Sequence, residues 1–274
     1  MNGTPDRQHL AVDWRLNEVE HRYGSHIHIL RDPLVTTYLA RLSSPRTIQP
    51  EINSLVRLLY HFLMVSVANN EFPRLRRSVE TRMITTCEHG IFTGEVIDPR
   101  TPVVVASMAR AGMLPGQVCF DALTDLLDGN VVRHDYFGVG RTVDQQQHVT
   151  GASVTYSRVG GPFADAILLI PDPMGATGGS VVETVRTYEQ QVDDKPRKTI
   201  AMHLIITPEY VRRITAELPG VIVYAARLDR GMSDDEVLQS VPGTFPDRER
   251  GLNDKQYIVP GAGGLGEIMT NAFV

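Results

Sequence analysis

A run of apolar residues at positions 166–170 leads directly into a glycine-rich segment at positions 171–180, and this junction constrains the fold more than any other feature. An apolar run without polar alternation predicts a strand that is covered on both faces of a sheet. Apolar positions that recur at helical spacing over residues 181–188 predict a helix behind the segment. A buried strand, a tight loop and a helix in this order indicate an α/β fold.

The same alternation of element types extends over the rest of the chain. Further helices are predicted at 51–70, 114–127 and 208–218, strands at 102–106, 200–206 and 221–226, and a two-stranded hairpin arm at 131–156. This order predicts a mostly parallel α/β sheet with right-handed crossovers. Residues 1–24 are polar, and we expect them to be an N-terminal extension to a single domain at 25–274.

Charge and composition exclude several classes of protein. The 274-residue chain has a formal net charge of −5, whereas nucleic-acid binders usually carry a basic excess, so we expect no nucleic-acid partner. Its apolar stretches are far shorter than the roughly 20 residues that cross a bilayer, so no membrane span is expected. The polar N-terminus lacks a secretory pattern, and the two cysteines suit a reducing compartment; we therefore expect a cytoplasmic location.

The segment 171–180 has the properties of an anion site. The first turn of a helix offers unpaired N–H groups and a positive dipole end, and Gly178 and Gly179 allow the backbone to approach a ligand closely. Thr177 and Ser180 add hydroxyl donors, whereas the lysine of a Walker A loop and the dinucleotide G-x-G-x-x-G pattern are absent. Two alternatives stay open: the glycines serve packing alone, and Asp172 is a turn or capping residue.

Several motifs resemble those of one enzyme family. The string Asp-Pro-Met-Gly-Ala-Thr-Gly-Gly-Ser at 172–180 resembles the signature with which uracil phosphoribosyltransferases bind phosphoribosyl diphosphate (PRPP). Residues 108–112 resemble the family's Leu-Arg-Ala-Gly turn, and residues 252–261 are similar to its Leu-Asn-x-x-Gly-Tyr-Ile-Val-Pro-Gly segment. Residues 28–35 resemble the family's opening His-Pro-Leu-Val, so the resemblance covers about residues 28–271.

The resemblance implies a fold and a reaction. The expected fold is a type I phosphoribosyltransferase core: a mostly parallel sheet flanked by helices, a β-arm hairpin and a C-terminal hood. The expected enzyme, a glycosyltransferase of pyrimidine salvage, transfers phosphoribosyl from PRPP to uracil and gives UMP and diphosphate. Mg²⁺ is expected to reach the site mainly through the phosphates, without a metal site made by the protein. A homodimer or higher homo-oligomer is also implied.

The resemblance also assigns roles to individual residues. Asp172, near the ribose, and Arg110, at the diphosphate, are the expected catalytic residues, because charge builds up on both groups in the transition state. The expected PRPP-binding residues are Arg110, Arg141, Asp172, Pro173, Met174, Gly175, Ala176, Thr177, Gly178, Gly179 and Ser180, and the expected uracil-binding residues are Tyr257, Ile258, Gly263, Gly264 and Leu265.

Two departures from the family pattern leave the function open. The family's base loop reads Pro-Gly-Leu-Gly-Asp-Ala-Gly-Asp, but residues 260–267 place Gly264 and Glu267 at the two aspartate positions. An insertion of about 20 residues, 232–251, precedes this loop and is a lid, a subunit contact or an allosteric element. The alternatives are therefore a phosphoribosyltransferase for another base, and a PRPP- or nucleotide-binding regulator that has lost turnover.

Overall fold

The computed structural model describes residues 5–143 and 149–273, and its centre is an eight-stranded sheet. Seven strands follow the order β1 (Ile27–Ile29), β10 (Val221–Leu228), β9 (Lys198–Ile206), β7 (Ile167–Pro171), β4 (Val103–Ala109), β5 (Val132–Val143) and β6 (Val149–Arg158), and β8 (Met174–Gly175) pairs with β9. Every pair in this sheet is parallel except β5 with β6. The expected mostly parallel sheet and its hairpin arm are therefore confirmed.

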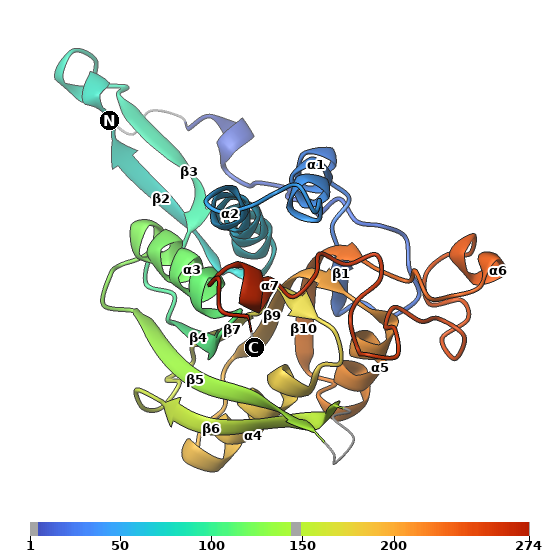
Figure 1. Ribbon diagram of the computed structural model, residues 1–274. Helices are drawn as coiled ribbons and strands as arrows, with labels where there is room; N and C mark the ends of the chain where they lie inside the picture. The colour runs from blue at the N-terminus through green and yellow to red at the C-terminus, as the bar shows by residue number, and fades with distance from the viewer. Residues whose placement is uncertain (1–4, 144–148, 274) are drawn as a thin grey trace.

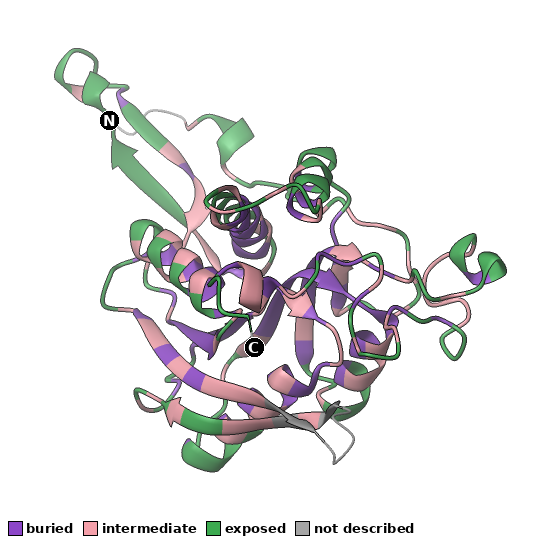
Figure 2. Ribbon diagram, viewed as in Figure 1, coloured by how far each residue is buried: buried purple, intermediate pink, exposed green. Residues whose placement is uncertain are grey.

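Helices cover both faces of the sheet (Figure 1). One face packs against α1 (Pro33–Leu42), α2 (Glu51–Glu71) and α3 (Met113–Leu126), and the other against α4 (Gly179–Gln191) and α5 (Pro208–Glu217). Each face has its own cluster of buried apolar side chains, so the central strands are apolar on both sides (Figure 2). This double burial is the physical reason why the strands β7 and β9 lack polar alternation.

A two-stranded ribbon made of β2 (Arg74–Glu80) and β3 (Ile91–Ile97) projects from the body of the protein (Figure 1). The sequence analysis did not predict it. The ribbon connects through the short 3-10 helix η2 (Arg82–Thr85), and most of β2 is exposed to solvent. A strand that buries neither face has no hydrophobic period, which explains why the pattern of apolar residues did not reveal it.

The N-terminal segment and the insertion at 232–251 pack against each other. The insertion contains the one-turn helix α6 (Asp235–Leu238), and the backbone N–H of Arg22 donates to the carbonyl of Pro242 at 2.8 Å. The fully buried carboxylate of Glu249 accepts hydrogen bonds from the Tyr23 hydroxyl at 2.5 Å and from Arg230 at 2.8 Å. The insertion is therefore anchored to the body of the protein, while the expected domain boundary at residues 24 and 25 stays a prediction.

Within the part of the chain that the structure describes, no helix has both the length and the apolar character needed to span a membrane.

Candidate active site

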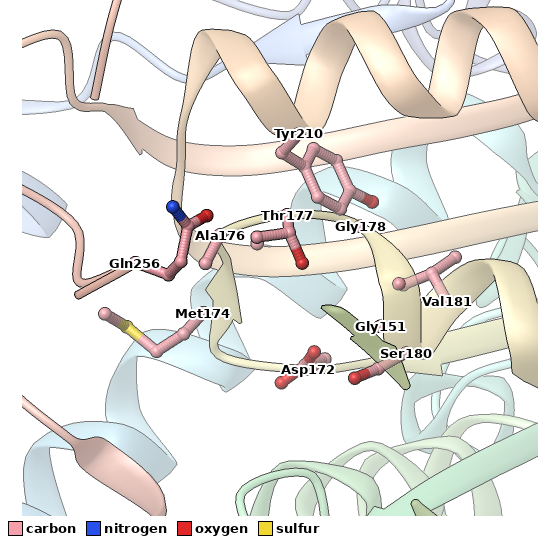
Figure 3. Close-up of a pocket in the computed structure, with 12 residues that line it drawn as sticks. Gly151, Asp172, Met174, Ala176, Thr177, Gly178, Ser180, Val181, Tyr210 and Gln256 are labelled. Atoms are coloured by element: carbon pink, nitrogen blue, oxygen red, sulfur yellow. The ribbon is translucent and has the colours of Figure 1, made fainter. Parts of the chain in front are cut away.

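A pocket lies where β7 ends and α4 begins, at the carboxyl edge of the sheet (Figure 3). Ligands of open α/β sheets bind at this edge. Residues 171–180, the predicted phosphate loop, form most of its wall, together with four residues from outside the loop. Its lining residues are Gly151, Asp172, Met174, Gly175, Ala176, Thr177, Gly178, Gly179, Ser180, Val181, Tyr210 and Gln256.

The carbonyl groups of the loop are held on the side of β9. The carbonyl of Pro173 accepts from the backbone N–H groups of Leu204 and Ile205, and that of Gly175 accepts from the N–H of Thr207 at 3.1 Å. The Thr207 hydroxyl donates to the carbonyl of Ala176 at 2.6 Å. Carbonyl oxygens would repel an anion, so their attachment to β9 and to the start of α5 leaves the pocket side to hydrogen-bond donors.

Two glycines of the loop are required by the backbone. A Cβ atom at Gly175 would lie 2.8 Å from the side chain of Ile206 and 3.1 Å from Tyr210, so any larger residue would push the loop off β9. Gly178 has a φ of +79° and caps the N-terminus of α4. Residues with a side chain adopt this conformation only at a cost in energy, whereas glycine does not.

The donors of the pocket are neutral. The first hydrogen bond of α4 runs from the N–H of Val182 to the carbonyl of Gly178 at 3.1 Å, so the preceding amides are those that a helix leaves unpaired. Thr177 and Ser180, which carry hydroxyls, also line the pocket, and the described residues that line it include no lysine or arginine. An anion here would be bound by backbone amides, hydroxyls and the helix dipole.

A buried histidine fixes the position of Asp172. His203 is fully buried; one ring nitrogen, Nδ1, lies 2.6 Å from the carbonyl oxygen of Asp172, and the other, Nε2, lies 2.6 Å from the Tyr210 hydroxyl. Because a carbonyl only accepts, Nδ1–H is the donor and the Tyr210 hydroxyl donates to Nε2. Burial lowers the pKa of His203 from 6.5 to about 4, despite its hydrogen bond with Asp172, so the ring is neutral at physiological pH.

Arg110 follows β4 directly and lies beside the end of β7. A Cβ atom at the nearby Gly112 would lie 2.8 Å from the carbonyl oxygen of Pro171, so the turn that carries Arg110 contacts the start of the phosphate loop. The guanidinium of Arg110 donates to the carbonyl of Ala272 at 2.8 Å and is exposed to solvent. Its contact with the C-terminal segment places it next to the predicted base loop.

Arg141 belongs to β5, where its backbone pairs with Ala152 of β6. Its side chain and residues 144–148 at the end of the arm lie outside the described part of the structure. Gly151 of the same arm lines the pocket, so the predicted arm does reach the phosphate loop.

The predicted base-binding residues lie outside the pocket that the phosphate loop forms. The side chains of Ile258 and Leu265 are buried, so only the backbone at these positions can face a ligand, whereas Tyr257 is exposed. Leu265 begins the short helix α7 (Leu265–Ile268), and a Cβ atom at Gly266 would lie 3.4 Å from that of Ala111. The base loop therefore lies beside the turn that carries Arg110.

Asp229 and Arg227, which the sequence analysis did not single out, hold the start of the base loop. The carboxylate of Asp229 is 2% exposed, accepts from the backbone N–H of Gly261 at 2.7 Å, and receives two hydrogen bonds from Arg227 at 2.6 and 2.8 Å. Arg227 also donates to the carbonyl of Gly261 at 3.1 Å. A charged pair thus fixes both backbone groups of one loop residue.

Glu267 compensates in space for the missing side chain of Gly264. A Cβ atom added at Gly264 would lie 2.8 Å from the Oε2 atom of Glu267, so this carboxylate fills the volume that a side chain at position 264 would enter. The base loop consequently keeps one carboxylate near the position at which the family pattern has aspartate.

Comparison with known proteins gives the family. The model of the family described as uracil phosphoribosyltransferase matches residues 29–249, which is most of the chain. The chain belongs to the uracil phosphoribosyltransferase family. Membership makes it an enzyme of the phosphoribosyltransferase class, and its sheet, its arm and the C-terminal segment over the strand ends agree with the type I phosphoribosyltransferase core (Figure 1).

Individual relatives agree with this assignment. The chain is 28% identical to the uracil phosphoribosyltransferase of Acidovorax sp. (strain JS42), over 89% of this chain and 97% of the relative. It is 29% identical to that of Roseiflexus sp. (strain RS-1), over 88% and 96%. Its fold resembles the structure of the AQ2163 protein from Aquifex aeolicus, with a TM-score of 0.66 and 21% identity over 90% of this chain and 99% of that one.

The uracil phosphoribosyltransferase family match ends before the base loop. It includes Arg110 and the whole phosphate loop but stops at residue 249, ahead of residues 252–267.

Proposed function

We propose that this enzyme transfers the phosphoribosyl group of PRPP to uracil and forms UMP and diphosphate. The observation that carries the proposal is the pocket at 172–180, whose carbonyls are held by β9 and whose open side presents amides and hydroxyls. The 5′-phosphate fits this set of donors. Asp172 lines the same pocket, and the ribose that follows the phosphate would be bound beside it.

The roles of the catalytic residues follow from where charge develops. The bond between C1′ of the ribose and the diphosphate oxygen breaks, so positive charge grows on the ribose and negative charge on the leaving group. The carboxylate of Asp172 stabilises the first charge, and Arg110, together with Arg141 on the arm, stabilises the second. The uracil nitrogen attacks from the side of the base loop, whose backbone the pair of Arg227 and Asp229 fixes.

Magnesium belongs to the same proposal. Among the described residues no cluster of three or more His, Cys, Asp or Glu side chains could hold a metal ion by itself, and Asp172 is the carboxylate in the pocket. Such a donor set fits a hard cation that is bound through substrate phosphates and keeps most of its water ligands. Bound there, Mg²⁺ would neutralise charge on the departing diphosphate.

A transfer to another base is the second candidate function. Gly264 lacks a side chain, and Glu267 provides the nearby carboxylate from a different backbone position. This change in the base loop favours a related pyrimidine or another base as the alternative substrate.

The test is the formation of nucleoside monophosphate from PRPP, Mg²⁺ and a panel of free bases. We expect UMP from uracil, and we expect Asp172→Asn to lower kcat at least about a hundredfold, as the loss of a group that stabilises the transition-state charge does. Asp193→Asn, on the exposed surface after α4, is the matched control and should keep full activity. A different nucleotide product would select the other base, whereas PRPP binding without any product would identify a regulator.

A further inference from the structure

Gln256 enters the phosphate pocket from the C-terminal segment. Figure 3 shows it on the side opposite to Ser180 and Val181, whereas the loop and α4 supply most of the other lining residues. A tight turn presents it: the Oδ1 atom of Asn253 accepts from the backbone N–H groups of Lys255 and Tyr257 at 3.0 Å. The N–H of Gln256 donates to the carbonyl of Asn253 at 2.8 Å. The position of the side chain is therefore fixed by the backbone of the turn.

The backbone at Gln256 is strained for a residue with a side chain. Its φ is +62°, in the left-handed region that glycine adopts without cost. The family pattern, as it aligns with residues 252–261, has glycine at this position. Strained residues are enriched at active sites and ligand clamps, where the side chain can provide something that glycine cannot.

The side chain of Gln256 adds a hydrogen-bond donor to the pocket. The walls offer backbone amides and hydroxyls but, among the described lining residues, no cationic side chain. Over residues 5–143 and 149–273, the side-chain amide of Gln256 forms no hydrogen bond with another residue, so its N–H groups are available to a ligand. A neutral amide donor that faces an anion site stabilises the bound anion without adding a charge.

We propose that Gln256 is a substrate-binding residue whose side-chain amide donates a hydrogen bond to the 5′-phosphate of PRPP. The inference rests on the proposed function, because it assumes that the pocket at 172–180 binds the 5′-phosphate. It adds a contact from the opposite wall, so that the C-terminal segment binds the phosphoribosyl group as well as lying beside the base.

The test replaces the side-chain amide of Gln256 with a carboxylate of the same size, or removes the side chain. Gln256→Glu keeps the shape but directs a negative charge at the phosphate, and should raise the KM for PRPP at least about tenfold. Gln256→Gly removes the donor and relieves the strained φ, so it should raise the KM for PRPP and also raise Tm. In both variants the KM for uracil should change less than the KM for PRPP does, because the side chain of Gln256 lines the phosphate pocket and lies outside residues 260–267. Gln239→Glu, exposed in the insertion, is the matched control.

Ribose 5-phosphate binding, measured by calorimetry, separates this inference from the function it rests on. If Gln256 contacts the phosphate, Gln256→Glu weakens this binding by about the same factor as it raises the KM for PRPP. Wild-type protein that makes no UMP would refute the proposed function, while ribose 5-phosphate binding would still report on Gln256. An unchanged KM for PRPP and unchanged ribose 5-phosphate binding in Gln256→Glu would overturn the inference.

Discussion

Acid should destabilise this protein in part through His203, between about pH 6.5 and pH 4. Burial lowers its pKa from 6.5 to about 4, so the unfolded chain binds a proton at this ring at a higher pH than the folded protein does. The contribution of the neutral His203 ring to the free energy of unfolding is therefore complete above pH 6.5 and falls as the pH drops below that value. It is lost in full near pH 4. At about 1.4 kcal/mol for each pKa unit, the loss in the free energy of unfolding is about 3 kcal/mol.

Urea unfolding at a series of pH values between about 7 and 4.5 measures this loss. His203→Gln keeps an amide N–H for the carbonyl of Asp172 and an oxygen for the Tyr210 hydroxyl, but it does not titrate. Its stability should therefore depend less on pH, whereas His89→Gln, on the exposed connection between β2 and β3, should behave as the wild type does. Equal pH slopes for the wild type and His203→Gln would refute the reasoning, because the other titrating groups are common to both.

Three further substitutions test other parts of the structure. Asp229→Asn removes the buried charge that holds Gly261, so it should lower the free energy of unfolding in urea by about 3 kcal/mol. It should also raise the KM for uracil more than the KM for PRPP. An equal rise in both KM values would contradict a role of Asp229 at the base loop. Gly178→Ala should cost about 1 kcal/mol, because φ is +79° there, and should raise the KM for PRPP; unchanged stability would show that the loop relaxes. Tyr23→Phe removes a donor from the buried carboxylate of Glu249 and should cost about 1–2 kcal/mol, while exposed Tyr156→Phe should cost nothing measurable.

Local pattern predicted most of the elements that bury a regular face, although α1 (Pro33–Leu42), which buries Val35, Leu39 and Leu42, was not among them. The helix predicted at 51–70 is α2 (Glu51–Glu71), and the strand predicted at 200–206 is β9 (Lys198–Ile206). Elements whose existence depends on a distant partner were not predicted. β8 has two residues and forms only because β9 lies beside it, and the ribbon of β2 and β3 is held by its own pairing rather than by burial.

The same distinction applies to the site. The phosphate loop is contiguous, so the sequence contains its glycines, its hydroxyls and the helix that follows. Asp229 contacts Gly261 and Gln256 lines the pocket of the phosphate loop, and each of these partners is distant in sequence. No rule of residue spacing predicts such contacts. Gln256 had one available signal, since it replaces glycine in an otherwise similar motif. Asp229 belongs to a stretch, residues 227–231, that matches the family's approach to the base loop, but its contact with Gly261 could not be predicted, because aspartate after a strand is common in turns.

The buried carboxylate that joins the N-terminal segment to the insertion also orders the events of folding. Glu249 and Tyr23 are 226 positions apart, whereas Glu249 and Arg230 are 19 apart. The entropic cost of closing a loop grows with its length, so the contact with Arg230 forms at lower cost and earlier. The N-terminal segment then docks onto an insertion that is already folded. Tyr23→Phe should consequently speed unfolding and leave the folding rate nearly unchanged in a stopped-flow chevron analysis; slower folding would show early docking instead. The contact between Tyr23 and Glu249 thus forms after the contact between Arg230 and Glu249.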